Sequence, residues 1–289
     1  MTSSETRDQT DQVQGRTFLP GTRIEVARPD FPRGRIRAAL FDFDGTLSLI
    51  REGWPEVMIP MMVDHLSRTP TTETPSELSQ RVEEFVMRLT GKQTIYQMIQ
   101  LADEIRSRGG KPLDPLEYKH EYHSLLWRRI SGRVAALESG TMTPEPLTVP
   151  GSRELLSALQ QRGCPLYLAS GTDIVYVQNE VRALALADFF GDHIYGAIDE
   201  YKNFSKKMVI ERVVDELNLQ PGELVGFGDG YVEIEEVKRV GGVAVGVASD
   251  EKHRTGINDW KRTRLLRAGA DIIVPDYRDL GALVDLLGM

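Results

Sequence analysis

The sequence predicts an α/β fold: a doubly wound, mostly parallel, Rossmann-like sheet interrupted by an all-helical domain. The first observation is a series of short apolar runs, each of strand length and bounded by glycine, proline or polar residues. These runs are AALF 38–41, PLYLA 165–169, HIYGAI 193–198, ELVGFG 223–228, VAVGVA 243–248 and DIIV 271–274. The second is that helical patterns separate most of the runs, which is typical of a parallel sheet covered by helices on both faces.

The helices of the sheet domain follow from apolar side chains at helical spacing. Residues 152–162 form one such pattern, and Gly163 comes directly after it as a helix stop. Residues 173–188 and 205–218 repeat apolar side chains in the same way, so one continuous helix is expected over each. TRIEV at 22–26 is expected to add a strand at the edge of the sheet.

Residues 49–148 break the alternation, because they contain helical stripes and no convincing strand. Helices are expected at 54–67, 76–90, 92–106 and 115–137, followed by a proline-rich linker at 141–151. The predicted domains are a polar, disordered tail at 1–21, an α/β core at 22–48 and 149–289, and a helical domain at 49–148.

Composition narrows the possible functions. The chain has 289 residues and a formal net charge of −8, which makes it a poor general binder of nucleic acid or anionic membranes. The single cysteine, Cys164, permits no internal disulfide, and no run of about 18 apolar residues or secretory signal is present. We therefore expect a cytoplasmic protein with no membrane or nucleic-acid partner. The possibility of a homodimer formed through apolar side chains of the helical domain stays open.

Two carboxylates stand two residues apart in the motif FDFDGTL at 41–47. Gly45 lets the backbone turn at the end of the strand, so Asp42 and Asp44 can converge there. A cation would relieve their repulsion, and Mg²⁺ prefers hard oxygen ligands of this kind. Asp229 follows another predicted strand and can complete the site, because the carboxyl ends of parallel strands meet at one edge.

A phosphate-binding arrangement is predicted at the same edge. Ser170 and Gly171 in LASGT offer a hydroxyl and backbone N–H groups at a helix start, which suits a phosphate oxygen. A lysine at the start of the next helix, Lys206 or Lys207 in FSKKMVIERVV, would neutralise the remaining charge.

The ordered set DFDGT, ASGT, a lysine and GDG resembles the haloacid dehalogenase superfamily of phosphohydrolases over 36–48 and 150–288. The resemblance implies that Asp42 is the nucleophile and that Asp44 protonates the leaving oxygen and then activates water. It implies that Ser170 and Lys206 hold the phosphoryl group. It also implies that Asp42, the backbone carbonyl of Asp44 and Asp229 bind Mg²⁺.

Two positions of the family pattern need comment. One carries a different residue here, and the other can be matched by more than one lysine. The family usually has a further aspartate four or five residues after the position of Asp229, and here Glu233 stands four residues on. We expect Glu233 to reach the metal directly or through water. For the lysine, Lys206 is favoured by its register against the apolar face, with Lys207 and Lys202 as alternatives.

The helical domain matches, in its position between the first two motifs, the α-helical cap of this superfamily. Such a cap closes over the site and contacts the leaving group of the substrate. We predict that Gly171, Thr46, Arg51 and Trp54 contact the substrate.

The expected activity is Mg²⁺-dependent hydrolysis of a small phosphorylated metabolite such as a sugar phosphate, a phosphoglycolate-like compound or a nucleotide. A phosphosugar mutase of the same superfamily and a non-catalytic binding protein on the same fold are the alternatives. A dehalogenase is disfavoured because it needs no Mg²⁺ and would not be expected to keep an acid at position 44.

A pair of histidines and a basic stretch are both interpreted as parts of surface helices rather than as binding sites. His120 and His123 lie three residues apart on a predicted helix, and a solvated helix surface is favoured over a metal site. WKRTRLLR at 260–267 is basic and amphipathic, and we expect a surface helix before the last strand.

Overall fold

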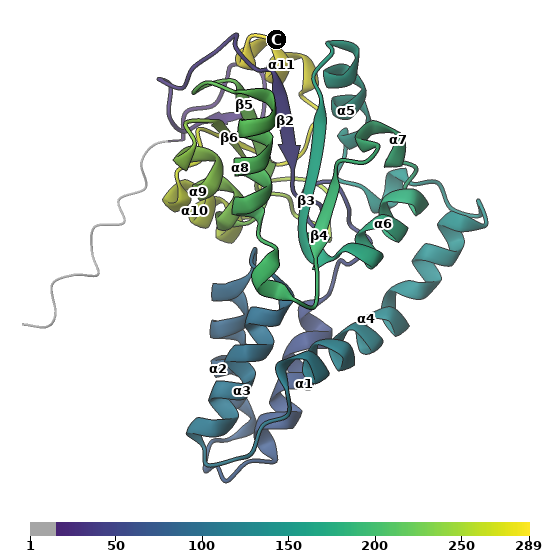
Figure 1. Ribbon diagram of the computed structural model, residues 1–289, viewed down its shortest axis with the longest axis vertical. Coiled ribbons are helices and arrows are strands. Elements are labelled where there is room, and N and C mark those ends of the chain that lie inside the picture. The colour runs from purple at the N-terminus through teal and green to yellow at the C-terminus, as the bar shows by residue number, and fades with distance from the viewer. Residues whose placement is uncertain (1–15) are drawn as a thin grey trace, which may run out of the picture.

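The computed structural model describes residues 16–289 and contains one seven-stranded sheet (Figure 1). The spatial order is β1-β7-β6-β5-β2-β3-β4, and every neighbouring pair is parallel except β1 with β7. The strands are β1 Glu25–Val26, β2 Ala38–Phe41, β3 Leu166–Asp173, β4 Ile194–Ala197, β5 Leu224–Gly228, β6 Val243–Val247 and β7 Ile272–Val274. The chain winds outward from β2 in both directions, which confirms the predicted doubly wound sheet.

Helices cover both faces of this sheet. They are α5 Ser152–Gln161, α6 Ile174–Ala183, α7 Ala187–Phe190, α8 Lys206–Leu217, α9 Tyr231–Arg239, α10 Asp259–Ala268 and α11 Leu280–Leu287. Alternate residues of β2 face two separate apolar clusters. Ala39 and Phe41 pack with α5, α6, α7 and α11, whereas Ala38 and Leu40 pack with α8, α9 and α10.

The single helix predicted over 173–188 is wrong in one respect, because the chain breaks between α6 and α7. Ala185 adopts a left-handed backbone conformation with φ 53°, and Leu184 and Leu186 on either side of it are both fully buried. In a continuous helix two residues that are two positions apart point in nearly opposite directions. The break therefore allows both leucines to enter the core.

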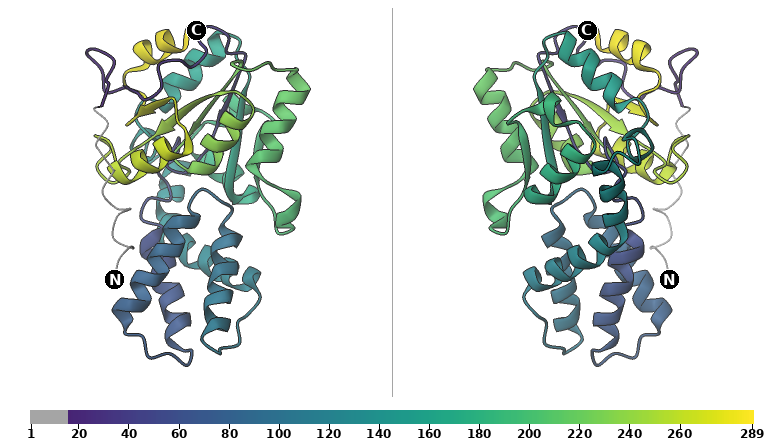
Figure 2. Two further views of the ribbon diagram at one scale, coloured as in Figure 1. Left: turned by 90° about the vertical axis from the view of Figure 1, so that its left-hand side faces the viewer. Right: turned by 90° about the vertical axis from the view of Figure 1, so that its right-hand side faces the viewer.

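The helical domain consists of α1 Pro55–Ser67, α2 Pro75–Leu89, α3 Thr94–Ser107 and α4 Pro115–Glu138. Thr74 and Asp114 each close a capping box at the start of α2 and α4, with proline at the first helical position. The four helices gather beyond the carboxyl ends of the strands (Figures 1 and 2). They correspond to the predicted insertion; its boundaries at 49 and 148 stay a prediction.

The predicted tail at 1–21 lies mostly on residues 1–15, outside the described residues. Within the described part, the N–H of Leu19 donates to the carbonyl of Ile24 at 2.8 Å, so this part of the predicted tail belongs to a turn that leads into β1. Over residues 16–289, each helix is too short or too polar to cross a lipid bilayer.

Candidate active site

The loop after β2 presents the two acids of the first motif at the sheet edge. The N–H of Asp42 still bonds to the carbonyl of Phe227 on β5 at 2.9 Å, which fixes this residue to the neighbouring strand. The chain then turns at Gly45, whose φ of 75° is left-handed. The N–H groups of Leu47 and Ser48 close the turn on the carbonyl of Phe43.

A buried lysine holds Asp42. The Nζ of Lys206 lies 2.8 Å from Oδ1 of Asp42 and 2.8 Å from Oε2 of Glu233. Burial lowers the pKa of Lys206, but the two carboxylates outweigh it and raise that pKa, so the lysine stays charged. Lys207 is exposed and Lys202 lies over the ring of Tyr201, so of the three candidates Lys206 is the one beside Asp42.

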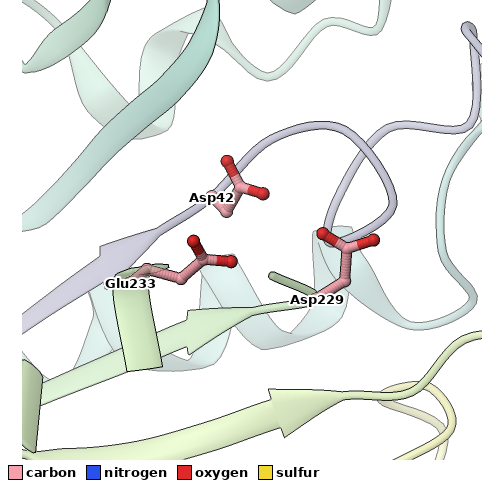
Figure 3. A group of neighbouring side chains, drawn as sticks. All are labelled: Asp42, Asp229 and Glu233. Carbon is pink, nitrogen blue, oxygen red and sulfur yellow. The ribbon is translucent and has the colours of Figure 1, made fainter. Parts of the chain in front are cut away.

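Three carboxylates gather below this loop (Figure 3). Asp42, Asp229 and Glu233 each offer an oxygen atom, and these atoms lie within 4.8 Å of one another. Burial raises the pKa of Asp42 well above its usual value, Lys206 opposes this, and the neighbouring Glu233 and Asp229 raise it further. Hard oxygen ligands in a buried, mutually repelling group fit a divalent cation such as Mg²⁺.

Glu233 is the least available of these acids. It is 1% exposed, and its Oε1 accepts the N–H of Gly230 at 2.6 Å while Oε2 accepts Lys206. A metal bound at the cluster would therefore compete with those donors for Glu233 or reach it through water. Its direct role as a metal ligand stays a prediction.

Asp44 lies in a different environment from Asp42. The hydroxyl of Thr172 donates to its Oδ2 at 2.8 Å, and Nε of Arg51 lies 3.7 Å from its Oδ1. Burial raises the pKa of Asp44 to about 6, although Arg51 opposes the shift. Much of the positive charge of Arg51 is taken by Glu180, whose Oε1 lies 2.7 Å from its NH2 group. A carboxyl group that titrates near neutral pH can both donate and accept a proton.

The second motif forms the opposite wall. The prediction that Ser170 and Gly171 lie at a helix start is wrong, because β3 continues to Asp173 and α6 begins only at Ile174. Ser170 is 1% exposed, and its Oγ accepts the N–H of Thr172 at 3.0 Å. The cavity between core and helical domain is bordered by most of the predicted residues: Asp42, Asp44, Arg51, Trp54, Ser170, Gly171, Lys206 and Asp229. Thr46 does not border it, because this residue of the loop is fully buried; its carbonyl accepts the hydroxyl of Tyr277 at 3.0 Å.

The helical domain reaches the cavity through the loop between α2 and α3. The side-chain amide of Gln93 donates to the carbonyls of Tyr201 and Phe204 at 3.1 and 2.7 Å. A side chain at Gly171 would come within 2.8 Å of the carbonyl of Lys92, and one at Gly91 within 3.3 Å of Gly230. The loop therefore meets the two strand-end motifs at backbone contact distance.

A second connection joins α4 to the core. Lys119 is 1% exposed, and its Nζ lies 2.9 Å from Asp173 and 2.8 Å from Asp199. The prediction of a solvated surface for the two histidines on this helix is correct for His120 and wrong for His123. His123 is 6% exposed because it packs at the contact between α4 and α6.

Sequence reasoning missed a second buried lysine at the site. Lys261 lies on α10, the helix predicted at the surface, yet it is 7% exposed. Its Nζ lies 2.8 Å from Asp229 and 2.7 Å from Glu251. Thr172, the hydroxyl donor to Asp44, was also missed as a functional residue, although it stands inside the quoted motif LASGT.

Comparison with known proteins identifies the family. A profile of haloacid dehalogenase-like hydrolases matches residues 36–241, which covers the sheet-edge motifs and the helical insertion. The chain belongs to this hydrolase family. The predicted superfamily and the prediction of a hydrolase are thereby confirmed. None of the curated proteins compared with this haloacid dehalogenase-like hydrolase matches it.

Solved structures share the fold at low sequence identity. A predicted phosphoglycolate phosphatase from Haemophilus somnus is 16% identical with a TM-score of 0.58, and the match covers 86% of this chain and 98% of that one. A haloacid dehalogenase family hydrolase from Deinococcus radiodurans, with bound phosphate and sodium, is 18% identical with a TM-score of 0.52 over 89% and 98%. A β-phosphoglucomutase from Clostridium difficile is 16% identical with a TM-score of 0.51 over 80% and 98%.

Proposed function

We propose that this haloacid dehalogenase-like hydrolase is a Mg²⁺-dependent phosphatase that cleaves a small phosphate monoester through an aspartyl-phosphate. The observation that carries the proposal is the pairing of Asp42, held by Lys206 at 2.8 Å, with Asp44, whose pKa lies at about 6. One acid is fixed beside a permanent cation, and the other can exchange a proton near neutral pH.

The proposed reaction has two steps. In the first, a carboxylate oxygen of Asp42 attacks phosphorus, the bond from phosphorus to the leaving oxygen breaks, and Asp44 gives its proton to that oxygen. In the second, Asp44 takes a proton from water, which attacks phosphorus and releases inorganic phosphate and the free carboxylate of Asp42. Ser170 and Lys206 hold the phosphoryl oxygens in both steps.

Bound Mg²⁺ would supply charge compensation for the phosphoryl oxygens, and Asp42, the carbonyl of Asp44 and Asp229 would hold it, with Glu233 nearby. The protein supplies the remaining positive charge through Lys206. Thr172 orients the carboxyl group of Asp44 by donating to its Oδ2, which leaves Oδ1 on the side of Arg51.

We infer that residues 49–148 are a cap that encloses the substrate against the core at 22–48 and 149–289. The cap borders the cavity with polar and aromatic groups such as Gln97 and Tyr122 and with the charged side chains of Arg51, Glu52 and Lys92. This lining supports a small phosphorylated metabolite, such as a sugar phosphate or a phosphoglycolate-like compound. The names of the similar structures, a phosphoglycolate phosphatase and a β-phosphoglucomutase, agree with that size of substrate.

The test is phosphate release from a panel of phosphorylated metabolites, with added Mg²⁺ and with a chelator. Asp42→Asn removes the nucleophile, and Asp192→Asn, at an exposed acid, is the matched control. We expect Mg²⁺-dependent release that is lost in the first variant and kept in the second. Mass spectrometry after rapid acid quench should find one phosphoryl group on wild type and none on Asp42→Asn.

Release that persists in Asp42→Asn would refute the proposed nucleophile. No release from the panel, together with interconversion of hexose phosphates detected by ³¹P NMR, would instead identify a mutase.

A further inference from the structure

Lys261 stands at the metal cluster as a fixed positive charge. Its Nζ contacts Oδ2 of Asp229 at 2.8 Å, Oε1 of Glu251 at 2.7 Å and Oγ of Ser249 at 3.2 Å. Ser249 in turn donates to the carbonyl of Gly45 at 2.7 Å. A lysine this deeply buried is rare without partners. Here its partners are Asp229, directly after β5, and Ser249 and Glu251 in the loop after β6.

Asp229 therefore belongs to two groups of charges, the ion pair with Lys261 and the carboxylate cluster. One of its two oxygens is occupied by the ammonium group of Lys261, while the same residue supplies an oxygen to the cluster with Asp42 and Glu233. A divalent cation bound to that cluster would share the carboxylate of Asp229 with Lys261. Two cations at such short range repel each other, and burial weakens the screening of that repulsion.

Glu251 reduces the repulsion between Lys261 and a bound cation. It borders the cavity and is the second carboxylate on Lys261, so it offsets part of the ammonium charge. The pair Lys261 and Glu251 thus adds little net charge, but the lysine is the member in contact with Asp229. Removing one partner or the other should change the local potential in opposite directions.

We propose that Lys261 is a positioning residue of the metal site that holds Asp229 in place and weakens the binding of the divalent cation. This inference rests on the proposed function in one respect, namely that the Asp42, Asp229 and Glu233 cluster binds Mg²⁺. Lys261 keeps Asp229 paired before the metal arrives, and its other partner, Ser249, holds the loop at Gly45 by donating to the carbonyl of Gly45.

A purely structural role makes a different prediction. If Lys261 only clamps the loops together, removing it or its partner should loosen Asp229, and both changes should weaken Mg²⁺ binding. If its charge acts on the metal, Lys261→Met should tighten binding and Glu251→Gln should weaken it. The opposite signs distinguish the two roles.

The experiment is isothermal titration of the full chain with MgCl₂ alone. We expect Lys261→Met to lower the Kd for Mg²⁺ by about tenfold or more and Glu251→Gln to raise it several-fold. Lys261→Arg keeps the charge and should stay within about twofold of wild type. Lys238→Met removes a comparable ion pair, with Asp271 at 2.8 Å on a different part of the sheet, and should leave the Kd unchanged.

An unchanged or raised Kd in Lys261→Met overturns the inference, and Lys261→Gln replaces this variant if circular dichroism shows that it is unfolded. Wild type that binds Mg²⁺ and releases phosphate while Lys261→Met fails to tighten refutes the inference alone. Absence of Mg²⁺ binding in every variant refutes the metal site of the proposed function, and the inference falls with it.

Discussion

Gly45 offers the sharpest test of how the loop after β2 and the cluster of Asp42, Asp229 and Glu233 fit together. A β-carbon added to its backbone would come 2.2 Å from Oδ2 of Asp229 and 3.0 Å from Nζ of Lys261. The backbone itself is left-handed, with φ 75°. Gly45→Ala therefore combines backbone strain with a collision against an ion pair.

The two costs can be separated with a second glycine. Gly109 has the same φ of 75°, and a side chain there meets nothing within 4 Å. The shared backbone strain is about 1–2 kcal/mol. At Gly45 the colliding Asp229 cannot simply rotate away, because it is tied to Lys261 at 2.8 Å, so the alanine must break a buried ion pair at a further cost of about 3 kcal/mol.

Urea unfolding at neutral pH measures both variants against wild type. We expect Gly109→Ala to lose about 1–2 kcal/mol of unfolding free energy and Gly45→Ala about 4–5 kcal/mol, because only the second adds the broken pair. Mg²⁺ binding should be lost in Gly45→Ala and kept in Gly109→Ala. Equal losses of stability in the two variants, with Mg²⁺ binding intact in both, would show that the contact between Gly45 and Asp229 is not tight and would refute this reasoning.

Asp44 and the contact between α4 and the sheet domain lead to three further predictions. Asp44→Asn should slow the first step, measured as the rapid-quench burst of leaving group, about 10²–10⁴-fold on alkyl phosphates but far less on p-nitrophenyl phosphate, whose leaving group needs no proton; equal losses in this first step would contradict a proton donor. Burial raises the pKa of Asp44 to about 6, so its stabilising protonation is complete below about pH 4 and is lost as the pH rises through about 6. Denaturation across this range should find Asp44→Asn more stable than wild type near about pH 8 by at most about 3 kcal/mol, with the gap closing near about pH 4; a constant gap would contradict the shift. Lys119→Met leaves Asp173 buried without its cation, so we expect a loss of about 2–4 kcal/mol and faster hydrogen exchange in α4 relative to α2; unchanged exchange would show that this pair does not hold α4 to the core.

The sheet and its catalytic edge could be predicted because they depend on local signals. A strand buried on both faces requires a short run of apolar residues, and the runs at 38–41 and 223–228 coincide with β2 and β5 within a residue or two. The ends of parallel strands meet in space, so residues directly after them are brought together whatever their separation in sequence. That geometry is why Asp42 and Asp229 border one cavity. Ser170 borders it from within β3, where the pairing with β4 is irregular between Ala169 and Asp173.

The remaining details depend on contacts between distant residues. The stretch WKRTRLLR at 260–267 contains several basic residues, and no periodicity marks Lys261 as the one that turns inward. Its partners, Asp229 and Glu251, come from other elements of the fold. Contacts between distant residues also explain two wrong predictions. Thr46 stands inside a motif but is fully buried, and His123 is buried because α4 packs on α6.

The contact of the loop between α2 and α3 with the second motif and with the loop after β5 has a consequence for protein engineering. Gly91 lies against Gly230, and Gly171 lies against the carbonyl of Lys92, so the two halves meet where side chains are missing. A helical domain transplanted from another family member would bring its own loop to this contact, and any added side chain there would hold the two parts apart. Exchange of residues 49–148, the proposed cap, therefore requires transferring the loop and both facing glycines as one unit.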